Sequence, residues 1–335
     1  MEIEFCPTTP RAVTRLHFGR GLLRTDLLSS LCKNHRPIVI ADKAVPRTFA
    51  LETLEVDACT AKTRETKQQL EDTLLQKGYG RDTLIVAYGG GSITDMAGFL
   101  AATYLRGVPW IAVPTTVLGM VDASIGGKTA IDTPAAKNAI GAIHHPHAII
   151  VDPDIAQSTR FDLAEILKIA LVQSTSLWEN AVRHGLTDDV MLEAIRAKIA
   201  VVQQDPTETG LRRVVNFGHT VAHALEVVSE YTLSHAEAVL IGTAAESYLS
   251  ATPQWPEIER VYQRFDLCLP AQYERRKFFE AMRQDKKNKD GQVRFVLMEQ
   301  MGKARSFGGQ YCAPVSEKQL EEMTLWLEQR FTRRK

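Results

Sequence analysis

The sequence predicts an α/β protein, with an N-terminal Rossmann-like, doubly wound parallel sheet and a mainly α-helical C-terminal domain. Up to residue 152, short apolar runs alternate with helical stretches, an order typical of parallel sheets with helices on both faces. One apolar run ends in three glycines that open a helix. After residue 152, apolar residues recur almost only at helical spacing. We therefore predict two domains, 1–152 and 153–335, with the active site in the cleft between them.

The strands and helices of the first domain follow from its apolar pattern. A ligand of a doubly wound sheet lies at the carboxyl ends of the strands. The glycine turn and the segment Pro114-Thr115-Thr116 both fall at such ends. Strands are predicted at 37–42, 51–58, 83–88, 110–114 and 147–152, and helices at 64–78 and 93–105.

The second domain shows the period of amphipathic helices, with one short strand signal. Helical patterns cover 162–183, 188–204, 211–229, 235–250, 256–265 and 315–330, and the strand signal covers 292–298.

The composition excludes several classes of partner. Among 335 residues, 40 basic and 40 acidic side chains cancel, so the net charge does not indicate a nucleic-acid or membrane surface. No apolar stretch is long enough to span a bilayer. The 5 cysteines are scattered, odd in number and without C-x-x-C spacing, which favours free thiols in a reducing compartment. We therefore expect a cytoplasmic protein.

The three glycines Gly89, Gly90 and Gly91 stand between a predicted strand and a predicted helix. Such a turn lets backbone N–H groups approach a pyrophosphate at the positive end of the helix. The turn lacks the G-x-G-x-x-G spacing, and three glycines alone often make only a tight turn. Four polar residues downstream, set among glycine and alanine, favour a ligand site: Asp122, Lys128, Lys137 and Asn138. We predict a dinucleotide with a second anionic group beside it.

A group of histidines and one glutamate predicts a metal site in the second domain. His219 and His223 are four residues apart and share a helical face, while His235 opens the next helix. Glu165 and Lys168 share a face of an earlier helix. Two imidazoles and one carboxylate with an open position are the ligand set of a catalytic zinc ion. The spacing leaves open which two of the three histidines would bind it.

Basic residues in the same domain suggest an anionic ligand. Arg212 lies four residues before Asn216 and shares the region of His219, and Lys198 precedes them. Lys286 and Lys287 stand before a turn signal. The pair is either an exposed charged turn or a lid that brings charge to a phosphate.

The chain resembles the 3-dehydroquinate synthase family of sugar phosphate cyclases over about residues 36–300. The motifs that carry the resemblance are GGGSITDMAGFLAATYLRG, VPTTVLGMVDASIGGKTAIDTPAAKNAIGAI, LAEILK, GLRRVVNFGHTVAHALE and LSHAEAV. The resemblance implies NAD and Zn²⁺, or Co²⁺, as cofactors and a sugar phosphate as substrate. It implies metal ligation by Glu165, His219 and His235. It implies NAD binding by Asp42, Lys62, Gly89, Gly90, Gly91, Asp95, Thr115, Thr116, Asp122, Lys128 and Lys137.

The resemblance also implies catalytic and substrate-binding residues. Arg106 would reach the phosphate site of a neighbouring subunit, which makes the protein a homodimer. The other members of the set are Lys128, Asn138, Lys168, Lys198, Arg212, Asn216, His223, Lys286 and Lys287, with one of the last two on the phosphate.

The implied reaction converts 3-deoxy-D-arabino-heptulosonate 7-phosphate to 3-dehydroquinate and phosphate in the shikimate pathway of aromatic amino acid biosynthesis. Three features differ from the family pattern: Cys59 occupies the place of a cofactor-binding Glu, the link from Asp152 to Glu165 is shorter, and Ala222 replaces a glycine in the helix of His219. The alternatives are another sugar phosphate cyclase, an NAD- and metal-dependent polyol dehydrogenase, and a catalytically silent homologue.

Overall fold

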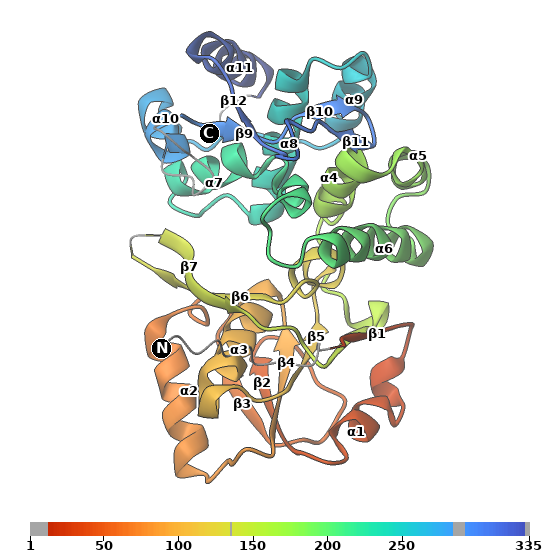
Figure 1. Ribbon diagram of the computed structural model, residues 1–335, viewed down its shortest axis with the longest axis vertical. Coiled ribbons are helices and arrows are strands. Elements are labelled where there is room, and N and C mark those ends of the chain that lie inside the picture. Colours follow the sequence, from red (N-terminus) through yellow and green to blue (C-terminus); the bar gives the residue numbers. More distant parts are fainter. Residues whose placement is uncertain (1–12, 135, 284–291, 332–335) are drawn as a thin grey trace, which may run out of the picture. The chain divides into compact units, whose positions relative to one another are not determined.

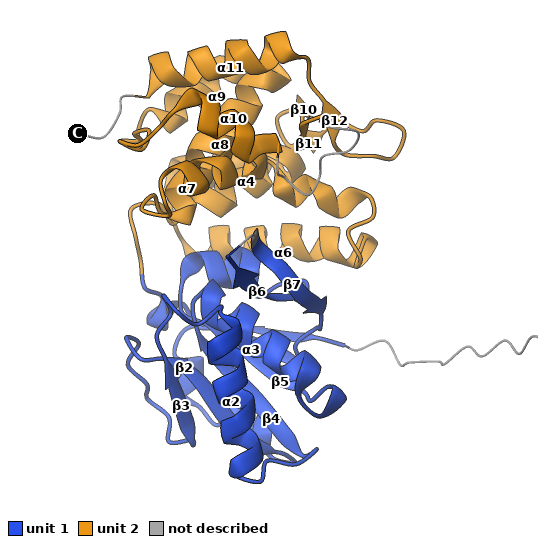
Figure 2. Ribbon diagram, turned by 90° about the vertical axis from the view of Figure 1, so that its left-hand side faces the viewer, with its two compact units in different colours: residues 1–157 blue, residues 158–335 orange. Residues whose placement is uncertain are grey.

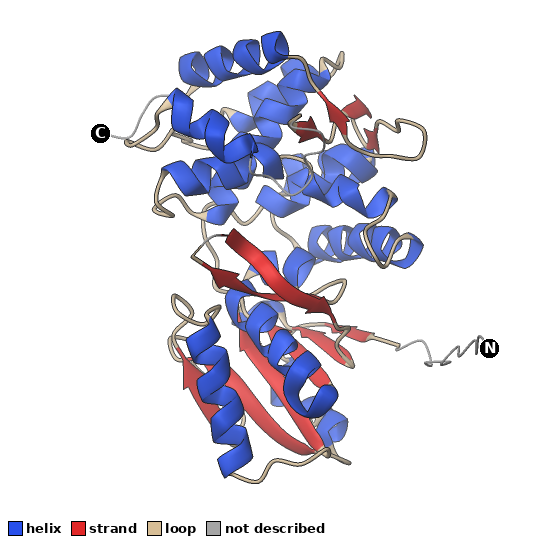
Figure 3. Cartoon of the chain, turned by 60° about the vertical axis from the view of Figure 1, so that its left-hand side comes forward, coloured by secondary structure: helices blue, strands red, loops and turns tan. Residues whose placement is uncertain are grey.

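The computed structural model describes residues 13–134, 136–283 and 292–331. The chain forms two compact units, residues 1–157 and residues 158–335 (Figure 2). The first is built on a sheet with helices, and the second is mainly helical (Figure 3). The fold class predicted from the sequence is confirmed. Among the described residues, no helix is both long and apolar enough to cross a membrane.

A parallel sheet of six strands forms the centre of the first unit (Figure 1). Apolar side chains cover both of its faces, and every residue of the strand Thr83–Gly89 is buried, as expected for a parallel sheet between helices. In spatial order the strands are β1 (Arg15–Phe18), β8 (Ala148–Val151), β5 (Trp110–Pro114), β4 (Thr83–Gly89), β2 (Arg36–Asp42) and β3 (Thr53–Val56).

Successive side chains of each strand point to opposite faces of the sheet, so each face presents its own set of apolar residues to the helices. Val39 and Val86 pack on one face, in a core that also contains Leu28 and Cys32 of helix α1 (Leu27–Cys32). The remaining helices of this unit are α2 (Arg64–Gln76) and α3 (Gly91–Thr103).

A hairpin of two antiparallel strands follows β5, and the sequence analysis did not predict it. It consists of β6 (Lys128–Thr133) and β7 (Ala136–Ile143), with Lys128 opposite Ile143. The segment combines glycines with charged residues, so its apolar alternation is weak. Its inner side packs closely on α3, because a Cβ atom at Gly98 of α3 would overlap the Thr129 side chain of β6. Strand β1 and helix α1 were also not predicted.

In its described residues, the second unit consists mainly of helices, and its four strands have two or three residues each. The helices are α4 (Ala164–Gln173), α5 (Thr175–His184), α6 (Asp188–Gln204), α7 (His219–Val228), α8 (His235–Ser250), α9 (Trp255–Tyr262), α10 (Arg275–Arg283) and α11 (Glu317–Arg330). The strands are β9 (Arg294–Phe295), β10 (Met298–Gln300), β11 (Lys303–Ala304) and β12 (Ala313–Pro314).

Two predicted helical stretches of this unit are interrupted, for local reasons. The stretch 162–183 divides at Ser174, which has extended backbone and whose hydroxyl accepts the Leu177 N–H at 3.1 Å as the N-cap of α5. The stretch 211–229 begins with a 3₁₀ turn, η5 (Leu211–Asn216), and α7 starts only after Gly218, whose φ is +80°. A helical period does not reveal such interruptions. The predicted strand at 292–298 is divided into β9 and β10, and α10 was not predicted.

Candidate functional site

The glycine turn joins β4 to α3, as predicted. A Cβ atom at Gly89 would come 2.6 Å from Ile93 Cγ1, and one at Gly90 would come 3.2 Å from Thr116 Cγ2. The Thr115 N–H donates to the Gly89 carbonyl at 3.0 Å. Larger residues therefore cannot occupy the turn without displacing its neighbours. A turn of this shape leaves backbone N–H groups at the start of α3 for an anionic ligand.

A lysine connects α3 to the hairpin in the same unit. Lys62 Nζ lies 2.7 Å from Asp95 Oδ2 and also hydrogen-bonds Asn138 Oδ1. The Lys62 carbonyl accepts the Asp132 N–H at 2.7 Å, and Asp132 Oδ1 accepts the Asn138 N–H at 2.7 Å. Burial raises the pKa of Asp95, although the Lys62 ammonium acts in the opposite direction. The structure thus brings together two predicted NAD residues and one predicted substrate residue.

The remaining sequence-predicted residues of this unit lie at strand ends or in turns. Asp42 ends β2 and accepts the Ala44 N–H at 3.0 Å. Asp122 is half-buried in the helical turn η3 (Gly119–Ala123) after β5. Lys128 and Lys137 are exposed on the hairpin. Asp42 and Asp122 therefore lie near the carboxyl ends of strands, where ligands of such sheets bind.

In the second unit, three helices begin at one cluster of side chains. Glu165 lies in the first turn of α4, and His219 and His235 are the first residues of α7 and α8. Glu165 Oε1 lies 3.9 Å from His219 Nε2 and 3.5 Å from His235 Nε2. One ligand atom from each residue lies within 4.8 Å of the others. This arrangement has the donor types and the spacing of a three-ligand zinc site with an open position.

The other nitrogen of each histidine ring points to a fixed acceptor. His219 Nδ1 lies 3.1 Å from the Phe217 carbonyl, and His235 Nδ1 lies 3.3 Å from Glu226 Oε1. A ring that donates from Nδ1 keeps the Nε2 lone pair for a metal. Both Nε2 atoms face Glu165, so the tautomers suit ligation.

The surroundings shift the pKa values of the two rings in opposite directions. Burial, followed by the Lys168, His223 and His235 charges, lowers the pKa of His219 well below its ordinary value. Burial also disfavours the charged form of His235, but hydrogen bonds to Glu165 and Glu226 raise its pKa to about 9. Burial thus favours the neutral form of His219, which a metal ligand requires, whereas His235 would have to release a proton in order to ligate.

His223 lies at the edge of this cluster. Its ring centroid lies 5.4 Å from that of His219 and 6.4 Å from that of His235. Its side chain is exposed, one helical turn beyond His219. The position of His223 therefore favours contact with a bound substrate over ligation of the metal ion.

The basic residues predicted for this unit are largely buried. Lys168 contacts Glu165 and is 1% exposed, Lys198 is 6% exposed and Arg212 is 1% exposed. Asn216 donates to Glu208 Oε1 at 2.6 Å. Burying a cation is costly unless acceptors compensate. Three buried cationic side chains in one unit are therefore unusual. Lys286 and Lys287 lie outside the described residues.

Three residues near the site were missed by the sequence analysis: Asp205, Glu208 and Glu226. Asp205 accepts backbone N–H groups of Thr209, Gly210 and Arg212 at 2.7 to 3.0 Å and so shapes the loop before η5. Helical spacing signals only Glu226, because it stands seven residues after His219 on one face of α7. The other two act through a loop that has no sequence period.

Two of the three departures from the family pattern lie in hydrogen-bonded turns. The shorter link contains the turn Pro153–Ile155, and Asp162 accepts the Thr159 N–H at 3.0 Å just before α4. Glu165 therefore still lies in the first turn of its helix. Cys59 is exposed, in a turn that Asp57 closes by accepting the Cys59 N–H at 2.9 Å.

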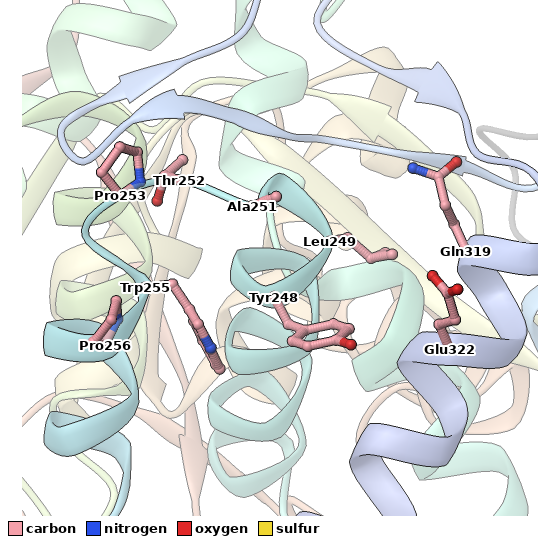
Figure 4. Close-up of a pocket in the computed structure, with 9 residues that line it drawn as sticks. All are labelled: Tyr248, Leu249, Ala251, Thr252, Pro253, Trp255, Pro256, Gln319 and Glu322. Carbon is pink, nitrogen blue, oxygen red and sulfur yellow. The ribbon is translucent and has the colours of Figure 1, made fainter.

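A separate hollow of about 530 Å³ lies between α8, α9 and α11 (Figure 4). Rings of Tyr248 and Trp255 line it together with Gln319 and Glu322, which project from successive turns of α11. Of the sequence-predicted site residues that the structure describes, none lines this hollow.

Comparisons with known proteins agree with this architecture. The family model for the 3-dehydroquinate synthase N-terminal region matches residues 53–163, and the model for the C-terminal region matches residues 162–288. The 3-dehydroquinate synthase of Acaryochloris marina (strain MBIC 11017) is 38% identical over 72% of this chain and 72% of its own. That of Corynebacterium jeikeium (strain K411) is 35% identical over 82% of each chain.

Solved structures share the fold over nearly the whole chain. The 2-epi-5-epi-valiolone synthase of Streptomyces hygroscopicus subsp. jinggangensis 5008, with NAD+ and Zn2+ bound, has a TM-score of 0.82 and 25% identity, and covers 98% of this chain and 100% of its own. A 2-deoxy-scyllo-inosose synthase complexed with carbaglucose-6-phosphate, NAD+ and Co2+ has a TM-score of 0.80 and 21% identity over 92% of this chain and 95% of its own.

The glycine turn, the lysine-bearing hairpin and the Glu–His–His cluster agree with a sugar phosphate cyclase, the class to which the matched family belongs. Within that class, the matched family models and relatives show that the chain belongs to the 3-dehydroquinate synthase family.

Proposed function

We propose that this protein is a 3-dehydroquinate synthase, which converts 3-deoxy-D-arabino-heptulosonate 7-phosphate to 3-dehydroquinate and phosphate in the shikimate pathway. One observation carries the proposal: the two family models together match residues 53–288. This range includes every residue assigned to catalysis or to the metal, from Arg106 to Lys287.

The first unit supplies the groups that would hold NAD. Backbone N–H groups at the start of α3 would bind the pyrophosphate, and the Asp42 carboxylate at the end of β2 would accept the hydroxyls of a ribose. NAD, when bound, supplies an acceptor for a hydride that is returned to the substrate in the same turnover.

The second unit supplies the groups that would hold a divalent ion. Glu165, His219 and His235 offer one carboxylate and two imidazole nitrogens, a set that suits Zn²⁺ or Co²⁺. The ion, when bound, lowers the pKa of substrate hydroxyls and stabilises negative charge on oxygen. Lys168 contacts Glu165 and so brings a positive charge next to that carboxylate.

Cationic and amide side chains would bind the two anionic groups of the substrate. Arg212, with Lys198, suits the carboxylate, because a guanidinium pairs with carboxylate oxygens through two parallel hydrogen bonds. Four residues suit the phosphate: Lys128, Asn138, His223 and either Lys286 or Lys287. Phosphate leaves during the reaction, so these groups stabilise the charge that develops on the leaving oxygen.

We further propose a cytoplasmic homodimer with Arg106 acting across subunits. Arg106 is exposed, and it follows the end of α3 that lies opposite the glycine turn. At about 1.5 Å per residue, that end is roughly 20 Å from the turn. Leu105 and Arg106 both have left-handed backbone, with φ of 47° and 69°, a conformation that costs energy in non-glycine residues. The strain is accounted for if the turn presents Arg106 to a partner.

Phosphate release tests the proposal. The protein is incubated with NAD, Zn²⁺ and the heptulosonate phosphate, while free phosphate and nicotinamide absorbance are followed together. Phosphate release with 3-dehydroquinate as product and without accumulated NADH is expected. A protein with Lys128→Met should release phosphate at least tenfold more slowly, because the substitution removes one charge-assisted contact.

Other results would identify the alternatives. Accumulation of NADH without phosphate release would mean a polyol dehydrogenase. Turnover of a different sugar phosphate only would mean another cyclase, and the absence of both signals in folded, metal-loaded protein would mean a silent homologue.

A further inference from the structure

Glu226 is a buried carboxylate beside the candidate metal site and has no role in the reaction outlined above. It lies on α7, is 4% exposed, and its Oε1 atom is 3.3 Å from His235 Nδ1. A buried carboxylate costs several kcal/mol of desolvation unless hydrogen bonds or charges compensate. An apolar side chain would fill the same space without this cost, so packing does not explain a glutamate here.

The hydrogen bond from His235 to Glu226 determines how the ring is used. Donation from Nδ1 places the remaining lone pair on Nε2, which lies 3.5 Å from Glu165 Oε1. The side chain of His235 is 35% exposed, so packing alone holds it weakly. The ring therefore depends on Glu226 for its orientation.

The other histidine differs in this respect. His219 is held through Nδ1 by the Phe217 carbonyl, a neutral acceptor, and its side chain is only 11% exposed. A carboxylate acceptor increases the electron density on the opposite nitrogen more than a carbonyl does, and makes the imidazole a stronger metal ligand.

The backbone of Glu226 also anchors the connection that leads to His235. Its carbonyl accepts the Ser229 hydroxyl at 2.9 Å and the Tyr231 N–H at 2.8 Å. Glu230 and Tyr231 have left-handed backbone, with φ of 50° and 61°. One residue thus fixes both the path of the chain between α7 and α8 and the ring at the start of α8.

We propose that Glu226 is a positioning residue of the metal site, which orients His235 and strengthens it as a ligand of the divalent ion. Helix α7 then contributes twice: it carries the ligand His219 and, two turns later, the carboxylate that holds the ligand of the next helix. The inference rests on the proposed metal-dependent function. It assigns Glu226 no contact with substrate.

Metal affinity tests the proposal without a measurement of activity. Zn²⁺ is titrated into metal-free protein in competition with a chromophoric chelator, for the native sequence and for Glu226→Gln. The amide keeps the size of the side chain but removes its charge. The apparent Kd for Zn²⁺ should rise about 10- to 100-fold, and the visible absorption of the Co²⁺-loaded protein should change in position or intensity.

Two further variants complete the experiment. Glu193→Gln is the matched control, because Glu193 accepts hydrogen bonds from Ser176 and Asn180 and none from the histidines. Its Zn²⁺ affinity should equal that of the native protein. Glu226→Asp keeps the charge but shortens the side chain, and should bind Zn²⁺ with intermediate affinity. If Glu226→Gln does not fold, this variant decides.

The possible failures are distinguishable. Native affinity and a native Co²⁺ spectrum in folded Glu226→Gln or Glu226→Asp would overturn the role of Glu226 and leave the metal site intact. If the native protein binds no Zn²⁺, or if His235→Ala binds it unchanged, the metal site itself is wrong.

Discussion

Gly242 of α8 lies directly on the carbonyl oxygen of Gly218, the residue before α7. A Cβ atom at Gly242 would overlap that oxygen and would come 3.0 Å from the Ala222 nitrogen. At Gly218, where φ is +80°, a Cβ atom would come 2.5 Å from Thr243 Cγ2. Two glycines thus allow the start of α7, with His219, to approach α8, which begins with His235.

Gly242→Ala should destabilise the protein despite the helix preference of alanine. Propensity alone predicts a gain of about 1 kcal/mol, whereas overlap with a backbone atom that cannot rotate away predicts a loss of about 1–3 kcal/mol. Urea unfolding measures the free energy. Gly19→Ala is the control, because the backbone of Gly19 is not left-handed and an added Cβ would meet only the Leu22 side chain, at an ordinary contact distance of 3.6 Å or more. Stabilisation by Gly242→Ala would contradict the close approach.

The metal ligands should be separable by substitution. His235→Ala and His219→Ala remove an Nε2 atom that faces Glu165, so metal content after dialysis should fall well below one ion per chain. His223→Ala should keep its metal but lose activity. Elemental analysis of the dialysed proteins gives the content. Metal loss in His223→Ala with full content in His235→Ala would reverse the assignment.

Asp205 should make stability depend on acid pH. Although burial acts in the opposite direction, hydrogen bonds from the backbone N–H groups of Arg212, Gly210 and Thr209 lower the pKa of this carboxyl. A carboxyl whose pKa is lowered in the folded state stabilises that state at pH values above its pKa in the unfolded chain, which is about 3.9. This contribution to the free energy of unfolding is lost as the pH falls from there through the pKa of the folded state.

Asp205→Asn should therefore lower the free energy of unfolding at neutral pH by about 1–3 kcal/mol. The difference from the native protein should shrink as the pH falls through 4 and below, because both chains then lack the charge. Denaturant unfolding at several pH values measures it. A difference that is independent of pH would show that the charge of Asp205 is not responsible.

NAD should act catalytically. Because the hydride is returned within each turnover, many phosphates should be released per NAD, with no net change in nicotinamide absorbance. The measurement is the ratio of phosphate released to NAD added, with NAD present at a much lower concentration than the substrate. One phosphate per NAD consumed would contradict internal return of the hydride.

Arg106 should complement a partner subunit. Homodimers with Arg106→Ala or Lys128→Ala should each be nearly inactive. In a mixed dimer one site lacks both groups, but the other keeps its own Lys128 and receives Arg106 from the partner. Activity should return on subunit exchange. Verified mixed dimers without recovery would place Arg106 in its own site or outside catalysis.

Much of the fold was predictable because its signals are local. The apolar runs of β2, β4 and β5 and the glycines after β4 specify their own conformation within a few residues. The hairpin of β6 and β7 was not predicted, because its strands, which pair Lys128 with Ile143, show little alternation of apolar and polar residues. Helix α10 was not predicted, because it is short and most of its residues are charged.

The sequence by itself determined the candidate ligand types: one glutamate and three histidines at helical spacing or at a helix start. The family resemblance implied Glu165, His219 and His235 as the ligand set, but only the tertiary structure shows that these side chains meet, that the side chain of His223 is exposed, and that Glu226 contacts His235. Spacing specifies the face of one helix. The distances between side chains of α4, α7 and α8 depend on how closely these helices pack, and packing is a property of the whole unit.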